Sequence, residues 1–338
     1  MSSITMEILK NIEIGKLRQH KNMTIHPVIY RGPTGPDYIS LDVALEVKEV
    51  VITEVSEGGS VPDLALRNNA QSAVLILDGE ELQGAKQNRV LNTTIMVAAG
   101  EQMNVPVSCT EQGRWSYSSR EFSSTEHIMR HDVRSRKMGS VHASLSEGRG
   151  YASDQMKVWE NIRMMAAESG VSSPTSAMSD TFEKHREEVD GFVSAFAVEE
   201  NQAGLLAFID GKLAGCDFIS RPQVYAGLHA KLLRSYAVDA VVAKPRRVVK
   251  EESVPAGDPV ADFLAAMAQC KEENFKSVGM GEDVRFLGQD LIGSALAVEG
   301  ETVHAAFFPK PAEENRQSLD QMLKSKMRAG NLWEKMSG

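Results

Sequence analysis

Short apolar runs separated by turn residues fill the N-terminal part of the chain, from Thr24 to about Tyr117. Examples are VVITEV at 50–55, VPDLAL at 61–66 and AVLILDGEEL at 73–82. Runs of this length are typical of β-strands joined by tight turns. Only LDVALEVK at 41–48 departs from the pattern, and its apolar spacing predicts one short helix. The sequence therefore predicts a β-rich N-terminal part with hairpins.

The pattern changes twice after residue 117. Residues 118–190 are rich in helix formers such as Met, Glu and Arg, with two Gly- and Ser-containing interruptions, which predicts a helical segment with two loops. Strand patterns then return around two predicted helices, from Pro222 to about Val242 and from Asp262 to about Glu273. Residues 311–338 have helical spacing and many charges, and they predict a terminal helical tail.

These patterns predict an α+β protein built from four segments. They are a β-rich subdomain at 1–117 with a polar hairpin motif, a helical segment at 118–190, an α+β subdomain at 191–310 and the helical tail at 311–338. A charged, proline-containing stretch at 244–259 reads as a surface linker within the third segment. The chain has 338 residues, and one hydrophobic core stops growing at roughly 250 to 300 residues, so we expect more than one packed unit.

Charge and targeting signals narrow the function classes. The chain carries 37 basic and 46 acidic residues, a net charge of −9, which argues against a surface devoted to nucleic acid or to an anionic membrane. It has neither a long apolar run nor a signal-peptide pattern, so we expect no membrane span. Its three cysteines are far apart and form no CxxC pair, which favours a cytoplasmic protein without disulfides or bound metal. These features leave a homo-oligomer open.

Three segments resemble one another: LILDGEELQG at 75–84, AFIDGKLAGC at 207–216 and LAVEGETVHA at 296–305. Each has an apolar run, an acidic residue followed by Gly, and a second strand-like run. An acidic residue and a Gly between two strands suit a tight hairpin, because Gly adopts positive φ without steric cost. We therefore expect three hairpins, and we leave open whether they form a true internal repeat.

The segment HIMRHDVRSRK at 127–137 combines two histidines with four basic residues. His127 and His131 would share a helix face at the spacing of a metal-binding pair. Arg130 and Arg134 crowd that face and would repel a cation, so we expect no metal. The segment lacks interleaved aromatic residues. A solvated helix face is therefore the stronger interpretation, and nucleic-acid binding is disfavoured.

The segment EELQGAKQNRVLNTT at 80–94 lies between two predicted strands and is mostly polar. If Lys86 to Met96 is extended, both faces of this strand carry hydrogen-bonding side chains. Such a strand runs either along an exposed edge or beside a polar cavity, where its amides and cations would hold an anionic or hydroxylated ligand. The two readings fit this segment equally well.

A second polar cluster, CTEQGRW at 109–115, ends the predicted strand NVPVSC. It would place the carboxylate of Glu111, the guanidinium of Arg114 and the ring of Trp115 at the mouth of a cavity. The alternative is a surface pair between Glu111 and Arg114, with Trp115 packed on the helical segment. The residues alone leave both arrangements open.

Several blocks together resemble a known family. They are LDGEELQGAKQNRVLNTTI, SCTEQGRW, VWENI, IDGKLAGCDFI, LLRSYAVDA and GSALAVEGETVHAAFF, in that order and within about residues 38–308. In these blocks the chain resembles the family named for its association with ADP-ribosylglycohydrolases and rhodanese-phosphatases. The sequence contains no P-loop, nucleophile-elbow or HExxH motif. The resemblance implies a link to ADP-ribose and NAD-derived metabolites, and it implies no particular reaction.

The resemblance also points to individual residues. The motif carboxylates are candidate general acids and bases for catalysis at an anomeric carbon: Glu80, Glu81, Glu111 and Asp217. The other polar and aromatic motif residues are candidates for binding a nucleotide-like ligand: Lys86, Gln87, Asn88, Arg89, Gln112, Arg114, Trp115 and His304.

Two functions from different classes follow. The first is the binding or processing of ADP-ribose or another NAD-derived nucleotide, with hydrolysis as one form of processing and with no cofactor. The second is a non-catalytic ligand-sensing or scaffold domain whose polar motif is structural. Paired carboxylates about 5 to 9 Å apart in a closed pocket would favour the enzyme. A shallow cationic groove with dispersed carboxylates would favour binding.

Overall fold

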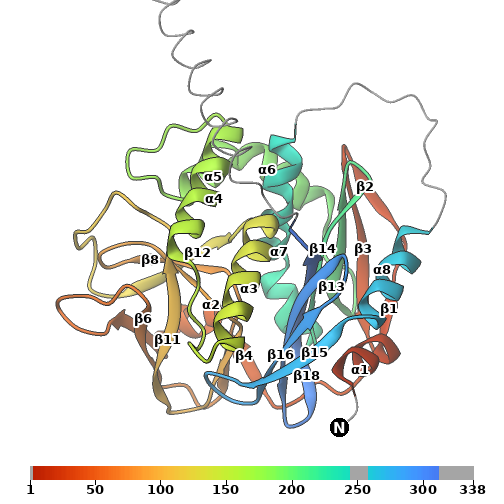
Figure 1. The fold of residues 1–338 in the computed structure, drawn as a ribbon, viewed down its shortest axis with the longest axis horizontal. Helices are drawn as coiled ribbons and strands as arrows, with labels where there is room; N and C mark the ends of the chain where they lie inside the picture. Colours follow the sequence, from red (N-terminus) through yellow and green to blue (C-terminus); the bar gives the residue numbers. More distant parts are fainter. Residues whose placement is uncertain (1–2, 244–257, 312–338) are drawn as a thin grey trace, which may run out of the picture.

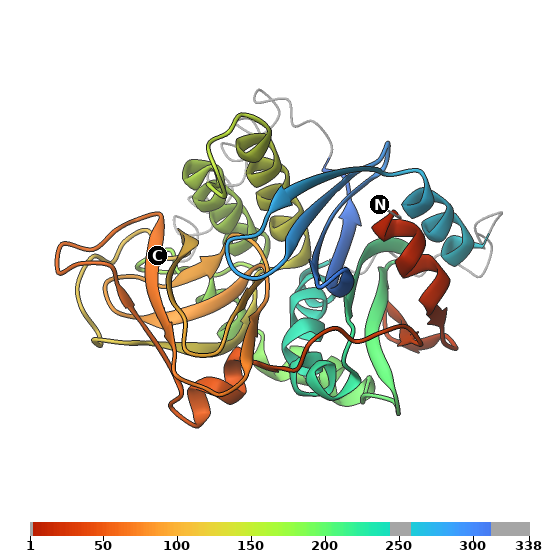
Figure 2. The same ribbon diagram turned by 90° about the horizontal axis from the view of Figure 1, so that it is seen from below.

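Two β-rich regions lie on either side of a group of helices, as Figure 1 and Figure 2 show. The computed structural model describes residues 3–243 and 258–311, and within these ranges the chain forms eight helices and 18 strands in three sheets. The predicted α+β class is confirmed, and so is the β-rich character of the N-terminal part.

The N-terminal region is built around a six-stranded antiparallel sheet in the order β12-β8-β9-β11-β6-β5. Its strands are β5 (Val50–Glu54), β6 (Asp63–Asn68), β8 (Glu80–Gly84), β9 (Arg89–Leu91), β11 (Gln102–Cys109) and β12 (Phe122–Ile128). Alternate residues of β5 and β6, such as Ile52 and Leu64, point into an apolar core. A bridge between Thr53 and Glu121 joins the two edge regions, so the sheet curls back on itself.

A small three-stranded sheet and one helix complete this region. The sheet consists of β10 (Ile95–Val97), β7 (Ala73–Ile76) and β4 (Tyr38–Ser40). Helix α2 (Leu41–Glu46) begins directly after β4, where Ser40 Oγ accepts a hydrogen bond from the backbone N–H of Val43 at 3.4 Å. This bond satisfies one of the free N–H groups of the first turn. The short helix predicted at 41–48 is therefore confirmed.

The largest sheet has nine antiparallel strands in the order β1-β3-β13-β14-β18-β17-β16-β15, with β2 paired to β3. Their bounds are β1 (Ile12–Ile14), β2 (Arg18–His20), β3 (Met23–Tyr30), β13 (Gln202–Ile209), β14 (Lys212–Ile219), β15 (Lys271–Lys276), β16 (Glu282–Leu287), β17 (Leu291–Val298) and β18 (Glu301–Pro309). Every residue of β13 and of β17 is buried, because helices pack on both faces of the sheet.

The other helices are α1 (Ile4–Asn11), α3 (His131–Ser146), α4 (Gln155–Glu168), α5 (Ser179–Lys184), α6 (Arg186–Ala195), α7 (Pro222–Val242) and α8 (Pro259–Ala268). Helices α1 and α8 share an apolar core with Phe286 and Phe307 of the large sheet. Helices α3 and α7 lie between this sheet and the N-terminal region (Figure 1). Helix α7 starts with Pro222, which is favourable at the first helical position, and its predicted bounds are confirmed.

Two predicted helical stretches differ from the structure. Residues 122–128, which were expected to be helical, form strand β12 and pair with β8. This stretch contains Phe, Thr and Ile, which favour strands. The prediction rests on the composition of the whole 118–190 segment, in which helix formers outnumber these residues. The helix predicted at 262–273 ends earlier than expected, because α8 ends at Ala268 and β15 begins at Lys271.

Two of the three predicted hairpins are present. The turns at 210–211 and 299–300 join β13 to β14 and β17 to β18, and all four turn residues have positive φ, from 48° to 84°. Such φ values at both positions are typical of a two-residue hairpin loop. The third prediction is wrong, because β7 and β8, on either side of residues 78 and 79, belong to different sheets.

The basic segment at 127–137 also differs from expectation. His127 lies near the end of β12 and His131 begins α3, so the two histidines share no helix face. The expected solvated face is wrong as well, because Arg134 and Lys137 are buried. Arg134 points toward Asp217 of β14 and Lys137 toward Asp78 of the turn after β7, and ion pairing offsets the cost of burying each charge.

Two sequence predictions fall outside the described residues. The predicted linker lies outside them at 244–257, and the predicted helical tail lies outside them from residue 312.

The largest apolar core takes side chains from the three predicted segments 1–117, 118–190 and 191–310, for example Leu75, Val133 and Phe308. The boundaries between these segments stay a prediction. None of the helices in the described ranges is long and apolar enough to cross a membrane.

Candidate functional site

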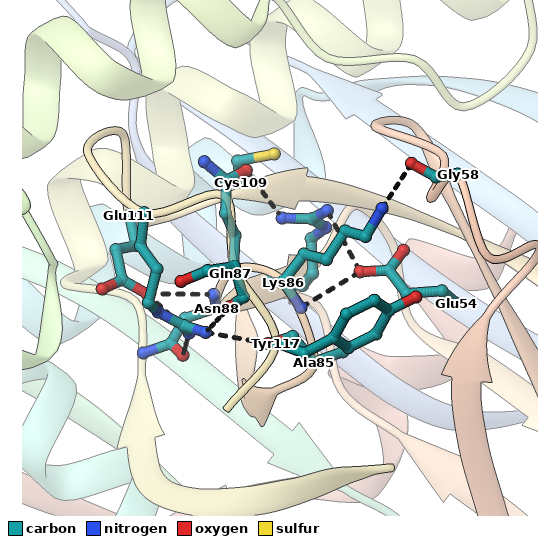
Figure 3. A network of polar contacts seen from close by, with 12 residues as sticks. Glu54, Gly58, Ala85, Lys86, Gln87, Asn88, Cys109, Glu111 and Tyr117 are labelled. Carbon is teal, nitrogen blue, oxygen red and sulfur yellow. Dashed lines mark hydrogen bonds and ion pairs between the residues drawn. The ribbon is translucent and has the colours of Figure 1, made fainter. Parts of the chain in front are cut away.

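The two polar motifs meet where the six-stranded sheet curls back on itself. Residues 85–88 form the turn between β8 and β9, and residues 110–117 follow β11, which pairs with β9. Glu54 at the end of β5 and Tyr117 lie beside them, although neither stands out in the sequence (Figure 3). We call this cluster the hairpin site, and its members are Glu54, Lys86, Gln87, Asn88, Arg89, Glu111, Arg114, Trp115 and Tyr117.

Arg114 ties the two motifs together. Its Nε donates to Glu111 Oε2 at 2.8 Å, and its Nη2 donates to Asn88 Oδ1 at 3.0 Å. Its Nη1 donates to the backbone carbonyl of Ala85 at 2.8 Å. The same Glu111 oxygen accepts a 3.4 Å bond from the Asn88 N–H. Arg114 therefore fixes the 85–88 turn against the loop after β11, which is a structural role.

Arg89 lies beneath this turn and is fully buried. Its Nη1 donates to Gln87 Oε1 at 3.0 Å, and its Nη2 lies 3.7 Å from Glu54 Oε1. The Glu54 carboxylate is also buried and accepts a 3.4 Å bond from the Lys86 N–H. The Trp115 ring covers Arg89, with its centroid 5.8 Å from Cζ. Arg89 and Glu54 thus form a buried ion pair under the surface of the site.

Lys86 carries a cation to the surface of the site. Its Nζ donates to the backbone carbonyl of Glu57 at 2.8 Å. It also donates to the carbonyl of Gly58 at 2.6 Å, as Figure 3 shows. It also lies 5.4 Å from the ring centroid of Trp115 and 5.1 Å from that of Tyr117. Trp115 and Tyr117 are 49% and 51% exposed. A cation held between two accessible aromatic rings is suited to a ligand with an anionic and an aromatic group.

A pocket of about 870 Å³ opens beside the hairpin site, and two residues of the site, Glu54 and Tyr117, contribute to its lining. It lies between the loop that follows β5 and the segment that precedes β12, at the seam where the bridge between Thr53 and Glu121 joins the two edges of the curled sheet. Its lining combines carboxylate, hydroxyl and guanidinium groups, from Glu54, Glu57, Tyr117, Ser119 and Arg120. The pocket is large enough for a small organic ligand.

Gln112 and Glu80 lie apart from the hairpin site. Gln112 accepts a 3.0 Å bond from Arg163 of α4 on the surface. Glu80 is fully buried and accepts a 2.8 Å bond from Lys231 of α7. Burial raises the pKa of Glu80, and the Lys231 charge partly offsets that rise. Lys231 reaches a second pocket of about 730 Å³ that Asp180 also lines.

Glu81 is buried between that second pocket and the hairpin site. Its carboxylate oxygens accept hydrogen bonds from Thr110 at 3.0 Å and from Thr125 at 3.4 Å. Burial raises the pKa of Glu81 to about 8, because no basic side chain of the described residues pairs with it. Burial thus favours the protonated form of Glu81, and this residue lines neither pocket.

Asp217 and His304 lie in the interior, between α3, α7 and the large sheet. Arg134 donates to both carboxylate oxygens of Asp217, at 3.0 and 2.9 Å, and Tyr236 donates to Asp217 Oδ2 at 2.5 Å. Burial alone would raise the pKa of Asp217, but the Arg134 charge holds it well below its usual range. His304 Nε2 is 3.6 Å from Asp217, and its Nδ1 shares a 2.9 Å hydrogen bond with Thr94.

The interior cluster contains more charge than the sequence motifs suggest. Lys137 donates to Asp78 and to the carbonyl of Leu91, so α3 is tied to the N-terminal region as well as to the large sheet. All of these groups are buried and paired, which is typical of a network that positions elements. No group of three or more His, Cys, Asp or Glu side chains within residues 3–243 and 258–311 is arranged to hold a metal ion.

The fold and the site define an α+β protein whose specific polar motifs gather at the seam of a curled sheet. Within that class, the chain belongs to the ARG and Rhodanese-Phosphatase-superfamily-associated Protein domain family, which matches residues 11–308. The resemblance seen in the sequence is therefore confirmed. Comparisons with curated proteins and with solved structures find no significant match. The family name records an association with other proteins and states no reaction.

Proposed function

We propose that the chain binds an ADP-ribose-like nucleotide in the pocket beside the hairpin site. The observation that carries the proposal is the Lys86 ammonium, which lies against the half-exposed rings of Trp115 and Tyr117. Within residues 3–243 and 258–311, its hydrogen bonds go only to neutral carbonyl groups. A diphosphate would bind Lys86, and an adenine would stack on one of the rings. The family's association with ADP-ribosylglycohydrolases supports this class of ligand.

Binding accounts for the carboxylates better than hydrolysis does. Glu80, Glu81, Glu111 and Asp217 are buried, and they make their hydrogen bonds to four different sets of partners. A glycosidase needs two carboxylates on either side of the scissile bond in one pocket. The dispersed arrangement instead favours a protein that holds or senses its ligand.

The second candidate is a scaffold domain whose polar motif is purely structural. The contacts of Arg114 favour this alternative, because its guanidinium bonds to Glu111, Asn88 and the carbonyl of Ala85. In that case the site would bind no nucleotide. The two candidates therefore differ in whether the protein binds a nucleotide, which can be measured.

Thermal unfolding with and without ADP-ribose separates the two candidates. A ligand at 100 times its Kd stabilises the folded state by about 2.7 kcal/mol. Lys86→Met and Trp115→Ala should each weaken ADP-ribose binding about tenfold or more, because they remove a charge-assisted contact and a stacking surface. Lys212→Met, which removes an exposed charge at the start of β14, is the matched control. A parent protein that ADP-ribose, NAD and AMP all fail to stabilise would support the scaffold instead.

A further inference from the structure

Three buried polar atoms beneath the hairpin site have no hydrogen-bond partner among the described residues. They are Oε2 of Glu54 and both Nε and Nη2 of Arg89. Glu54 Oε1 and Arg89 Nη2 are 3.7 Å apart, so the carboxylate and the guanidinium are neighbours. Buried polar groups without partners are rare because each one costs desolvation energy. One carboxylate oxygen and two guanidinium nitrogens that make no hydrogen bond within the described residues therefore lie close together.

A vicinal diol has the complementary hydrogen-bonding groups. One hydroxyl donates to a carboxylate while its neighbour accepts from a guanidinium, and each hydroxyl can do both. A phosphate fits poorly, because the negative charge of Glu54 would repel it. Glu54 also lines the pocket of about 870 Å³, so the carboxylate end of the pair borders the proposed nucleotide site.

We propose that Glu54 and Arg89 form a subsite for the vicinal diol of a ribose, and that residues 55–61 form a lid over it. This inference rests on the proposed nucleotide binding and adds the group that the site recognises. Arg89 then holds a sugar rather than a diphosphate, which leaves Lys86 as the contact for the anionic group.

The lid covers the subsite through Gly59. A methyl group at this position would lie 3.5 Å from Glu54 Oε2 and 3.4 Å from Trp115 Cζ2, and Gly59 has φ of +79°. The backbone of the lid therefore passes directly over the free carboxylate oxygen. Glycine permits that approach because it has no side chain and adopts positive φ without strain.

Two side chains, of half-buried Lys86 and exposed Tyr117, hold the lid in place. Lys86 Nζ donates to the carbonyls of Glu57 and Gly58, and the Tyr117 hydroxyl donates to Glu57 at 3.2 Å. Exposed hydrogen bonds to neutral carbonyls contribute little to stability. A diphosphate would compete with those carbonyls for Lys86, since an ammonium bonds more strongly to an anion. Ligand binding and release of the lid are coupled through Lys86 in this way.

Calorimetry with ADP-ribose, ADP and 2′-deoxy-ADP tests the diol subsite. In the parent protein, loss of the diol that the subsite holds should weaken binding about ten- to hundredfold. The loss appears between ADP-ribose and ADP if that diol belongs to the terminal ribose, and between ADP and 2′-deoxy-ADP if it belongs to the adenosine ribose. Glu54→Gln keeps the shape of the side chain and removes the charged acceptor. In this variant the same ligand comparison should show a difference of less than about threefold.

The outcomes separate the subsite from the wider proposal. If none of the three ligands binds, nucleotide binding fails and the subsite fails with it. If ADP-ribose binds and Trp115→Ala weakens it, but Glu54→Gln keeps the full discrimination, the subsite alone is wrong. Hydrogen exchange tests the lid without any ligand: Lys86→Met should speed amide exchange in residues 55–61 and leave β11 unchanged. Equal exchange in both proteins would overturn the lid.

Discussion

Arg134 of α3 and Asp217 of β14 form a two-bond ion pair at 3.0 and 2.9 Å, and both side chains are fully buried. The two residues are 83 positions apart in the chain. Lys137, one turn along the same helix, bonds to Asp78 of the N-terminal region. Buried ion pairs therefore fix helix α3 to both β-rich regions. The N-terminal region, which contains the pocket at the curled sheet, is attached to the large sheet through α3.

Asp217→Asn should destabilise the protein by about 3 to 5 kcal/mol, because it leaves the charge of Arg134 buried with a weaker partner. Denaturant unfolding measures the loss. Glu13→Gln is the control, since Glu13 pairs with Arg31 and both side chains are 63% exposed. Its cost should stay below about 1 kcal/mol. Similar losses in the two variants would contradict a structural role for the buried pair.

Gly79→Ala should be more damaging than Gly100→Ala, although φ is +77° at one position and +72° at the other. Both variants place a side chain at positive φ, which has a similar cost. A methyl group at Gly79 would lie 2.9 Å from Arg134 Cγ, whereas one at Gly100 would have nothing within 4 Å. The free energy of unfolding should fall by about 1 to 3 kcal/mol more in Gly79→Ala, because its methyl group crowds Arg134. Denaturant unfolding of both variants measures this difference. Equal losses would show that Arg134 moves aside freely.

Glu81→Gln should flatten the dependence of stability on pH. Burial raises the pKa of Glu81 from 4.5 to about 8, so the folded state keeps a proton that the unfolded state releases. The stability from this group is complete below pH 4.5 and is lost as the pH rises to about 8. The slope is at most about 1.4 kcal/mol per pH unit.

The measurement for Glu81 is urea unfolding of both proteins at about pH 5 and about pH 8. The neutral Gln side chain should give the variant a relative gain in stability at the higher pH. A stability difference that stays constant between the two pH values would contradict the raised pKa.

Much of the fold follows from local sequence signals. The apolar spacing of α7 and its first residue, Pro222, fix a helix that the structure reproduces. The Asp-Gly and Glu-Gly turns at 210–211 and 299–300 are also local signals, and they identify two hairpins. Strand β12 escapes prediction because its pairing with β8, across about 40 residues of sequence, decides its conformation.

The candidate site is predictable only in part. The motifs around Lys86 and Glu111 are visible in the sequence because they are dense in polar residues and belong to adjacent strands. Glu54 is not, because a single acidic residue at the end of an alternating strand looks like any solvated position. Arg134 is misread as solvated for a similar reason. Its partner, Asp217, is distant in sequence, and no local pattern marks a buried ion pair.

The most direct measurement is a crystal structure of the protein with ADP-ribose bound. The account predicts the nucleotide in the pocket between residues 54–57 and 117–120, with a phosphate at Lys86 and the adenine against Trp115 or Tyr117. A ribose diol should contact Glu54 and Arg89. ADP-ribose seated instead in the pocket at Lys231 and Asp180, or absent at saturating concentration, would contradict the central claim.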